Sequence, residues 1–91
     1  MMEYSVLLEA RDPARNIHRA YGISAGQDLF GEWIVAITYG RIGARGHSKT
    51  VAVEDKAAAA RYVERCIKRR ETAPRRIGVG YTVRSTVGGL S

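Results

Sequence analysis

The residues best suited to do chemistry lie in and beside one glycine-punctuated stretch, Tyr39 to Gly46. Arg41 and Arg45 stand between its glycines, and Lys49 follows with no acidic residue between these three cations. Exposed backbone amides beside guanidinium and ammonium groups suit phosphate oxygens. The Tyr39 ring, beside Arg41, could stack on a base or a ribose. We therefore predict a phosphate-contacting edge, although solvated basic loops and amphipathic tyrosines at strand ends are common too.

The glycines of this loop do not indicate a nucleotide-binding site. The glycine-rich loops that hold nucleotide phosphates lie between a strand and the start of a helix. Here a second alternating run, His47 to Val53, follows the loop, so the loop joins two strands. Access to positive φ explains Gly40, Gly43 and Gly46 as turn geometry without any ligand.

The chain around this loop alternates between apolar and polar residues in stretches that predict β-strands. These stretches span residues 4–10, 16–24, 32–39, 47–53 and 77–84. The loop of residues 40–46 is short enough to keep its two strands neighbours, which predicts an antiparallel pair. Tyr21 and Trp33 fall on apolar faces and are interpreted as core. Leu29 and Phe30 lie in the connection before the third strand, and we expect that connection to fold back onto the core.

One stretch, from Asp55 to about Glu71, predicts an α-helix. Ala57 to Ala60 are four strong helix formers in a row, and Asp55 is placed to cap the amino end. Apolar residues recur at spacings of three and four, which gives a narrow apolar stripe. Glu64 can pair with Lys68 one turn further on.

The outer side of this helix carries a second group of cations. They form either a solvated face with local ion pairs or a second positive surface for a polyanion. The positions that we assign to such a surface are Arg61, Arg65 and Arg69. Whether this surface joins the loop depends on tertiary structure.

A run of strands with a single helix predicts an α+β domain. We expect an antiparallel β-sheet of about five strands, with one α-helix over about 55–71 packed on one face. At 91 residues the chain forms one domain with a modest core. We place this domain at residues 1–84 and expect the small, glycine-containing residues 85–91 to form a flexible C-terminal tail.

The composition favours a polyanionic partner. The formal net charge is +6, and all but three of the 15 lysines and arginines are arginine, which makes bidentate contacts with phosphate. The single Cys66 excludes an internal disulfide framework. We find no apolar run of about 20 residues and no charged region followed by an apolar stretch at the N-terminus. We therefore expect a cytoplasmic protein without a membrane partner, associated with the nucleoid if it binds DNA.

No set of residues frames a catalytic site. The adjacent carboxylates Glu54 and Asp55 are interpreted as a helix cap, and Cys66 lies on the apolar stripe, where a buried inert thiol is expected. His18 and His47 have no ligand-spaced partners for zinc. We predict that the chain is not an enzyme and needs neither metal nor cofactor.

An ordered set of motifs resembles the WGR domain over nearly the whole chain, from about Tyr4 to Val83. The set consists of Asp28-Leu-Phe-Gly31, Trp33 with its alternating neighbours, Tyr39-Gly-Arg-Ile-Gly43 and Gly46, then the helix with Ala57 to Ala60, and Gly80-Tyr81. The resemblance implies a mixed fold of an antiparallel sheet with one helix. In DNA-dependent poly(ADP-ribose) polymerases, similar domains contact DNA near a strand break and relay contacts between neighbouring domains.

The resemblance also extends to short stand-alone bacterial proteins. It implies that the family's central aromatic residue and arginine correspond to Tyr39 and Arg41. The name-giving tryptophan is replaced here by Tyr39, which keeps a stackable ring but loses area and the indole donor. Nothing resembles the polymerase's catalytic domain, so no ADP-ribosyl activity is implied.

Together these features predict a non-catalytic nucleic-acid-binding module. We expect DNA as the partner, near strand ends or breaks, with RNA left open, and a monomeric protein. The predicted contact residues are Tyr39, Gly40, Arg41, Arg45, Lys49, Arg61, Arg65 and Arg69. The alternative is a protein-interaction module that docks an acidic partner on the same basic surface.

Overall fold

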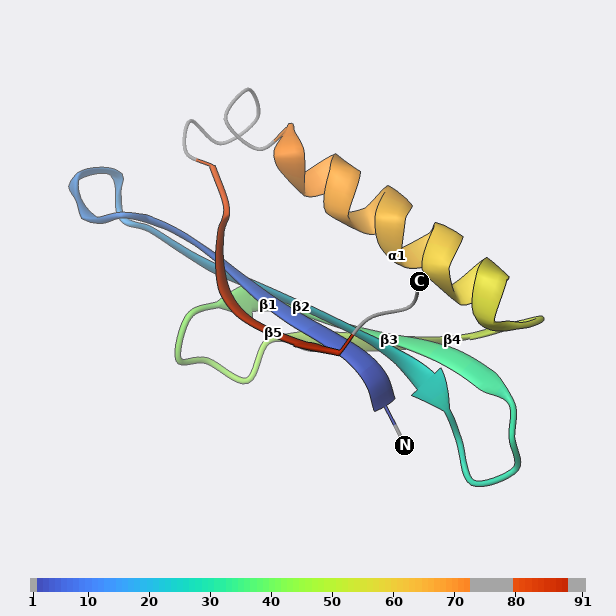
Figure 1. Ribbon diagram of the computed structural model, residues 1–91. Coiled ribbons are helices and arrows are strands. Elements are labelled where there is room, and N and C mark those ends of the chain that lie inside the picture. The colour runs from blue at the N-terminus through green and yellow to red at the C-terminus, as the bar shows by residue number, and fades with distance from the viewer. Residues whose placement is uncertain (1, 73–79, 89–91) are drawn as a thin grey trace.

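The computed structural model describes residues 2–72 and 80–88 as a five-stranded antiparallel sheet with one helix against it (Figure 1). The strands are β1 (Met2–Asp12), β2 (Ile17–Gln27), β3 (Trp33–Arg41), β4 (His47–Val53) and β5 (Thr82–Gly88), and the helix is α1 (Lys56–Glu71). A short 3₁₀ helix, η1 (Pro13–Arg15), joins β1 to β2. The predicted α+β class is confirmed.

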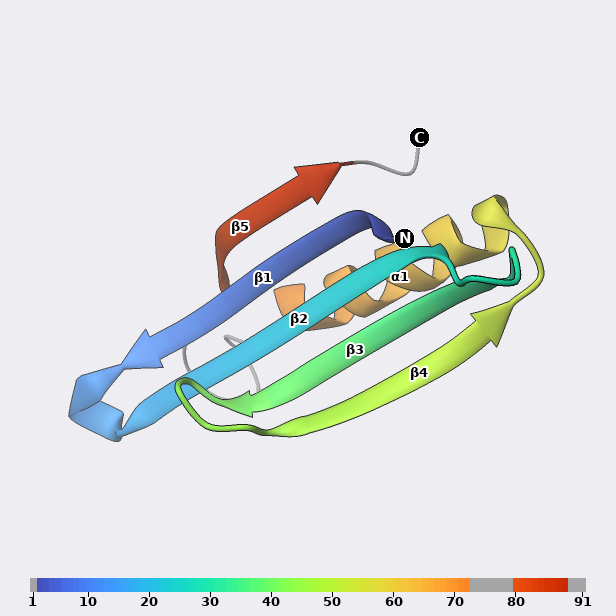
Figure 2. The same ribbon diagram turned by 90° about the horizontal axis from the view of Figure 1, so that it is seen from below.

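The sheet order is β4-β3-β2-β1-β5, so the first four strands form a meander and α1 carries the chain back to the opposite edge. The predicted antiparallel pairing of the strands that flank the glycine loop is confirmed, with Tyr39 opposite His47. Figure 2 shows the sheet from the side that α1 does not cover. One sheet face therefore holds the core, and no helix of the described residues covers the other face.

The core lies between α1 and the middle strands. Ile23 and Val35 are the largest fully buried side chains, and Ala59 and Val63 meet them from the helix. Ala59 is small enough to bring the helix backbone close to the sheet, and β-branched side chains fill a pleated surface well. Tyr21 is buried and Trp33 packs against the cluster, as the alternation predicted.

The helix begins as predicted. The Asp55 carboxylate accepts a hydrogen bond from the Ala58 N–H at 2.8 Å, and Asp55 itself is extended, which is the geometry of an N-cap. The predicted pair between Glu64 and Lys68 also forms, with 3.4 Å between its charged atoms.

The helix is shorter than the strands that it covers. Sixteen residues of α1 rise about 24 Å in all at ~1.5 Å each. The eleven residues of β1 or β2 extend about 36 Å at ~3.3 Å each. Part of the helix-side face is thus left uncovered where β1 turns into β2, and the β1–β2 hairpin projects beyond the helix in Figure 1.

The last strand ends later in the chain than predicted. Residues 77–79 lie outside the described part of the chain, and β5 runs from Thr82 to Gly88 rather than ending at Arg84. Ser85 to Gly88, which the composition assigned to the tail, pair with β1. The reason is that β5 is held by backbone pairing to the free edge of β1, which needs no apolar alternation. Residues 89–91 lie outside the described part.

The expectation for Leu29 and Phe30 is wrong. These side chains are 96% and 91% exposed, at the tip of the β2–β3 loop. The loop closes on itself instead, because the Asp28 carboxylate accepts from the backbone N–H groups of Phe30 and Glu32 at 2.9 and 3.0 Å. This Asx-type closure directs the two apolar side chains away from the sheet.

The cap of α1 gives a direct stability test. We expect Asp55→Ala to lower the free energy of unfolding by about 1 kcal/mol, because the Ala58 N–H loses its acceptor. Glu54→Ala, one residue earlier and exposed, is the matched control and should change it by less than about 0.5 kcal/mol. Urea unfolding followed by circular dichroism measures both, and equal losses would contradict the assignment of the cap.

Candidate nucleic-acid interface

A cavity of about 330 Å³ opens on the helix-side face where α1 ends. We call it the rim cavity. Its lining comes from β2 and the turn before it, the end of β3, the last turn of α1 and the segment before β5. The lining residues are Asn16, Ile17, His18, Arg19, Ala20, Tyr39, Gly40, Arg41, Arg70 and Tyr81. Three arginines thus meet two tyrosines in one hollow with no carboxylate in its described lining.

Arg41 is positioned from a distant turn. Its Nη2 donates to the Asn16 side-chain oxygen at 3.2 Å, across 25 residues of sequence. Asn16 adopts φ 55°, a left-handed conformation that asparagine tolerates. The Ile42 N–H donates to the His18 carbonyl at 2.9 Å and carries the β2–β3 ladder past the strand ends. The hydrogen bond to Asn16 therefore holds the guanidinium of a residue that lines the cavity.

Arg70 is held by stacking. Its guanidinium carbon lies 4.3 Å from the centre of the Tyr21 ring, within the range of a cation–π contact. Its Nε is buried and has no hydrogen-bond partner among the described residues. Burial raises the pKa of the Tyr21 phenol, and a hydrogen bond with Cys66 raises it further. These contacts fix the last turn of α1 over the sheet and place a cation in the cavity wall.

Tyr39 presents a half-exposed ring beside this cavity. It is 48% exposed, and its ring centre lies 5.4 Å from that of His47 on the neighbouring strand. Lys49 follows His47 on the same sheet face, opposite Ile37. A ring supported on one side and open on the other can accept a further stacked ring.

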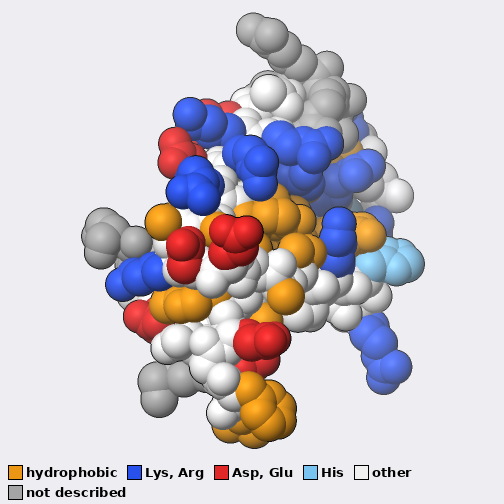
Figure 3. Space-filling model, turned by 90° about the vertical axis from the view of Figure 1, so that its right-hand side faces the viewer, with side chains coloured by type: hydrophobic (Ala, Val, Ile, Leu, Met, Phe, Trp, Pro, Cys, Tyr) orange, Lys and Arg blue, Asp and Glu red, His pale blue; other side chains and the backbone are white. Residues whose placement is uncertain are grey.

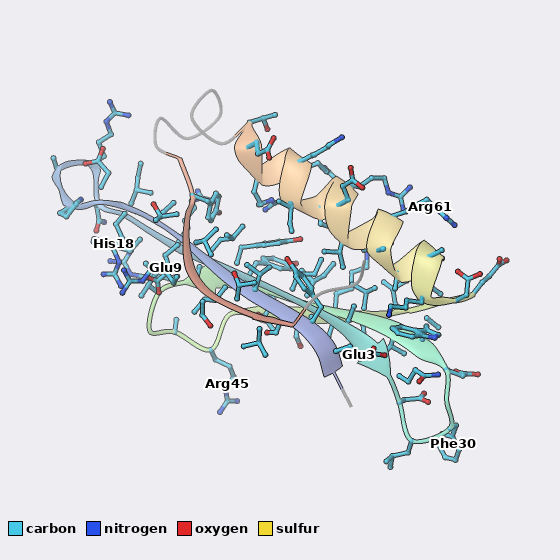
Figure 4. The ribbon with its side chains drawn as sticks, in the orientation of Figure 1. Glu3, Glu9, His18, Phe30, Arg45 and Arg61 are labelled. Atoms are coloured by element: carbon cyan, nitrogen blue, oxygen red, sulfur yellow. The ribbon has the colours of Figure 1, made fainter. Side chains whose placement is uncertain are left out.

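The glycine loop is a turn, as predicted. Gly40, Gly43 and Gly46 all have positive φ. A Cβ on Gly40 would come within 2.7 Å of the Gly46 Cα, so only glycine allows the loop to close. The Ala44 N–H donates to the Arg41 carbonyl at 3.0 Å. The loop folds away from α1, and Arg45 projects from the side of the sheet opposite the helix (Figure 4).

The predicted contact residues therefore divide into three groups. Tyr39, Gly40 and Arg41 line the rim cavity, and Lys49 shares their sheet face. Arg45 projects from the other side of the sheet, where it lines a separate small pocket of about 80 Å³ together with Tyr39, Gly40 and Arg41. The helix cations Arg61, Arg65 and Arg69 belong to the surface over α1, where Figure 3 shows Lys and Arg side chains gathered. Arg61 and Arg65 line a different pocket on the flank of the helix.

Seven lining residues of the rim cavity were not among the predicted contact residues, and four of these have nitrogen-bearing side chains: Asn16, His18, Arg19 and Arg70. Two had a usable signal. Arg19 continues the buried face of Tyr21 and Ile23 at strand spacing, and Arg70 continues the stripe of Val63 and Ile67 at helical spacing. A positively charged residue at the end of such an apolar stripe indicates where the buried face of the strand or helix ends and solvent begins. Asn16 and His18 gave no comparable signal.

Two other kinds of site are missing from the described ranges, 2–72 and 80–88. No three His, Cys, Asp or Glu side chains are grouped there in a way that could hold a metal ion. Nor does the described part of the chain contain a helix that is both long and apolar enough to cross a bilayer.

Comparison with protein families gives one match. The family model of the WGR domain matches residues 4–74, which is most of the chain. The comparisons with curated proteins and with solved structures gave no match. The matched range contains every residue of the rim cavity except Tyr81.

The buried phenol predicts a loss of stability at high pH. Because the pKa of Tyr21 is raised above 10.0, the folded state disfavours the phenolate. Below about pH 10 the phenol is protonated in both the folded and the unfolded state, and its contribution to the free energy of unfolding is complete. As the pH rises from there through the raised folded-state pKa of Tyr21, the unfolded chain ionises first and the free energy of unfolding declines. We expect Tyr21→Phe to lose less unfolding free energy than the wild type between about pH 9 and about pH 12. Urea titrations at both pH values test this, and identical losses would contradict it.

Proposed function

The chain belongs to the WGR domain family, and from that membership and the rim cavity we propose that it is a non-catalytic module that binds DNA. The family is one of nucleic-acid-binding, non-catalytic domains. The observation that carries the proposal for this chain is the convergence of Arg19, Arg41 and Arg70 on one cavity. They come from two strands and the helix, so the fold brings together three cations that are far apart in sequence.

The chemistry of the cavity suits a phosphodiester backbone. Guanidinium groups bind phosphate oxygens in a bidentate manner, and Arg41 is already oriented by Asn16. Lys49 adds a flexible positive charge along the same face. The cations over α1 add a field that attracts a polyanion without specifying its sequence.

Tyr39 favours a strand end or break over continuous duplex. Bases inside a duplex already stack on their neighbours, whereas a terminal base pair or an exposed ribose has a free face. The half-exposed Tyr39 ring, backed by His47, can cover such a face. Tyrosine offers less area here than the family's tryptophan, so we expect weaker stacking.

The first test concerns the cations. We expect Arg41→Glu to weaken binding to a labelled nicked duplex by about 10- to 100-fold, because a charged hydrogen bond is worth roughly 1.5–3 kcal/mol. Arg45→Glu changes the net charge equally but from the opposite face, and it is the matched control with a much smaller loss. Fluorescence anisotropy at two salt concentrations should give a log–log slope of about −0.9 per contacted phosphate.

Two results would refute this proposal. One is affinity that does not depend on salt, and the other is equal loss in the two arginine variants. The absence of DNA binding at low salt would favour the rival function, in which the same cations dock an acidic protein.

The second test concerns the ring. We expect nicked and blunt-ended duplexes to bind more tightly than a closed circular duplex, and Tyr39→Ala to remove this preference, since stacking is worth about 1–3 kcal/mol per base. Tyr39→Phe retains the ring and should keep the preference, and Tyr39→Trp should strengthen it. A preference that survives Tyr39→Ala would assign end recognition to other residues.

A further inference from the structure

The β2–β3 loop displays two large apolar side chains on a rigid support. Leu29 and Phe30 are almost fully exposed, and we call them the tip. Besides the Asp28 carboxylate bonds, the Gly31 N–H donates to the Asp28 carbonyl at 3.1 Å. The Gln27 side-chain amide donates to the Gly31 carbonyl at 3.0 Å. These hydrogen bonds hold the loop in a conformation in which Leu29 and Phe30 do not reach the core of their own chain.

The surroundings of the tip are acidic. Asp28 and Glu32 flank it in sequence, and Figure 3 shows further acidic side chains between the tip, at the bottom of that view, and the cations above α1. This charge opposes contact with DNA phosphates. A surface complementary to the tip would be an apolar pocket for Leu29 and Phe30 with basic residues at its edge for the flanking carboxylates.

The chain itself carries such a hollow. A pocket of about 490 Å³, which we call the α1 pocket, lies between the outer flank of the helix and the end of β4. It is lined by Val53, Ala58, Arg61, Tyr62, Glu64, Arg65 and Lys68. Its apolar members are Val53, Ala58 and Tyr62, and the Arg65 guanidinium carbon lies 5.4 Å from the Tyr62 ring centre. Glu64, its single acid among the described lining, pairs with Lys68.

We propose that the tip of one copy docks in the α1 pocket of a second copy. The apolar side chains leave water, an aromatic ring burying roughly 150–250 Å², while Asp28 and Glu32 approach the arginines of the pocket. Phe30 lies on the side of the sheet away from α1 and Arg61 lies on the helix, so a copy does not fill its own pocket (Figure 4). This proposal differs from the sequence-based expectation of a monomer.

The contact is heterologous, because the tip and the pocket are different surfaces of the same chain. Two apolar side chains and a few charges make a small interface, so we expect weak, concentration-dependent association. None of the tip or α1 pocket residues lines the rim cavity. Self-association therefore leaves Arg41 and Tyr39 open, and it can be tested without DNA, independently of the proposed function.

Sedimentation equilibrium of the full chain between about 10 and 500 µM tests the proposal, a range suited to a small interface. We expect the average mass of the wild type to rise with concentration and to fall back in high salt. Leu29→Ser with Phe30→Ser should weaken association at least ~10-fold, as truncation of interface anchors does. The same change at another exposed apolar pair, Val83→Ser with Val87→Ser, is the matched control and should have no effect.

A mixing experiment tests the pairing of the two surfaces. Arg61→Glu with Arg65→Glu disables the pocket and keeps the tip, so this variant and the tip variant should each be monomeric. Mixed in equal amounts, they should form a one-to-one complex, since each supplies the surface that the other lacks. A wild type that stays monomeric, association that survives the tip variant, or a mixture without a complex would each overturn the proposal. Circular dichroism confirms that the exposed variants are folded.

Discussion

The structure depends on one packing contact, the narrow apolar stripe of α1 against β2 and β3. Ala59 and Val63 cover Ile23 and Val35 at the centre of the cluster that makes the helix-side face of the sheet dry. A single helix of 16 residues cannot cover strands that extend further. The chain therefore has a boundary on one sheet face where burial ends and polar residues begin.

The rim cavity lies at that boundary, and its geometry follows from it. Tyr21 is the last buried residue of β2 before Arg19, and the Arg70 guanidinium closes the helix over its ring. Beyond this contact the helix ends and the strands continue, so Arg19 and Arg41 face solvent. The same feature that limits the core thus concentrates cations beside an aromatic ring.

The other end of the molecule has the opposite character. There the β2–β3 loop satisfies its own backbone through Asp28 and leaves Leu29 and Phe30 in water among acidic residues. A net charge of +6 conceals this separation, because cations gather over α1 and three arginines line the rim cavity. The small domain thus carries a basic surface over its helix and an acid-flanked apolar tip at the β2–β3 loop.

The sequence by itself determined the elements that arise from local periodicity and capping. Alternation located Val35 and Ile37 on a buried face, three- and four-residue spacing located Val63, and Asp55 marked the start of the helix. It also determined that the glycines form a turn, because glycine adopts positive φ without the steric cost that a side chain brings. The family could be recognised from the same ordered motifs.

Only the tertiary structure decided how these elements combine into sites. Arg70 and Arg41 meet because the helix crosses the sheet and Asn16 turns back, which are contacts between residues distant in sequence. β5 forms through backbone pairing that leaves no apolar pattern, and Leu29 and Phe30 stay exposed because their loop satisfies its own hydrogen bonds. Local patterns report which face of an element is buried. Which other element packs against that face, and where the helix stops covering the sheet, depend on the lengths of the elements and on the angle at which they cross.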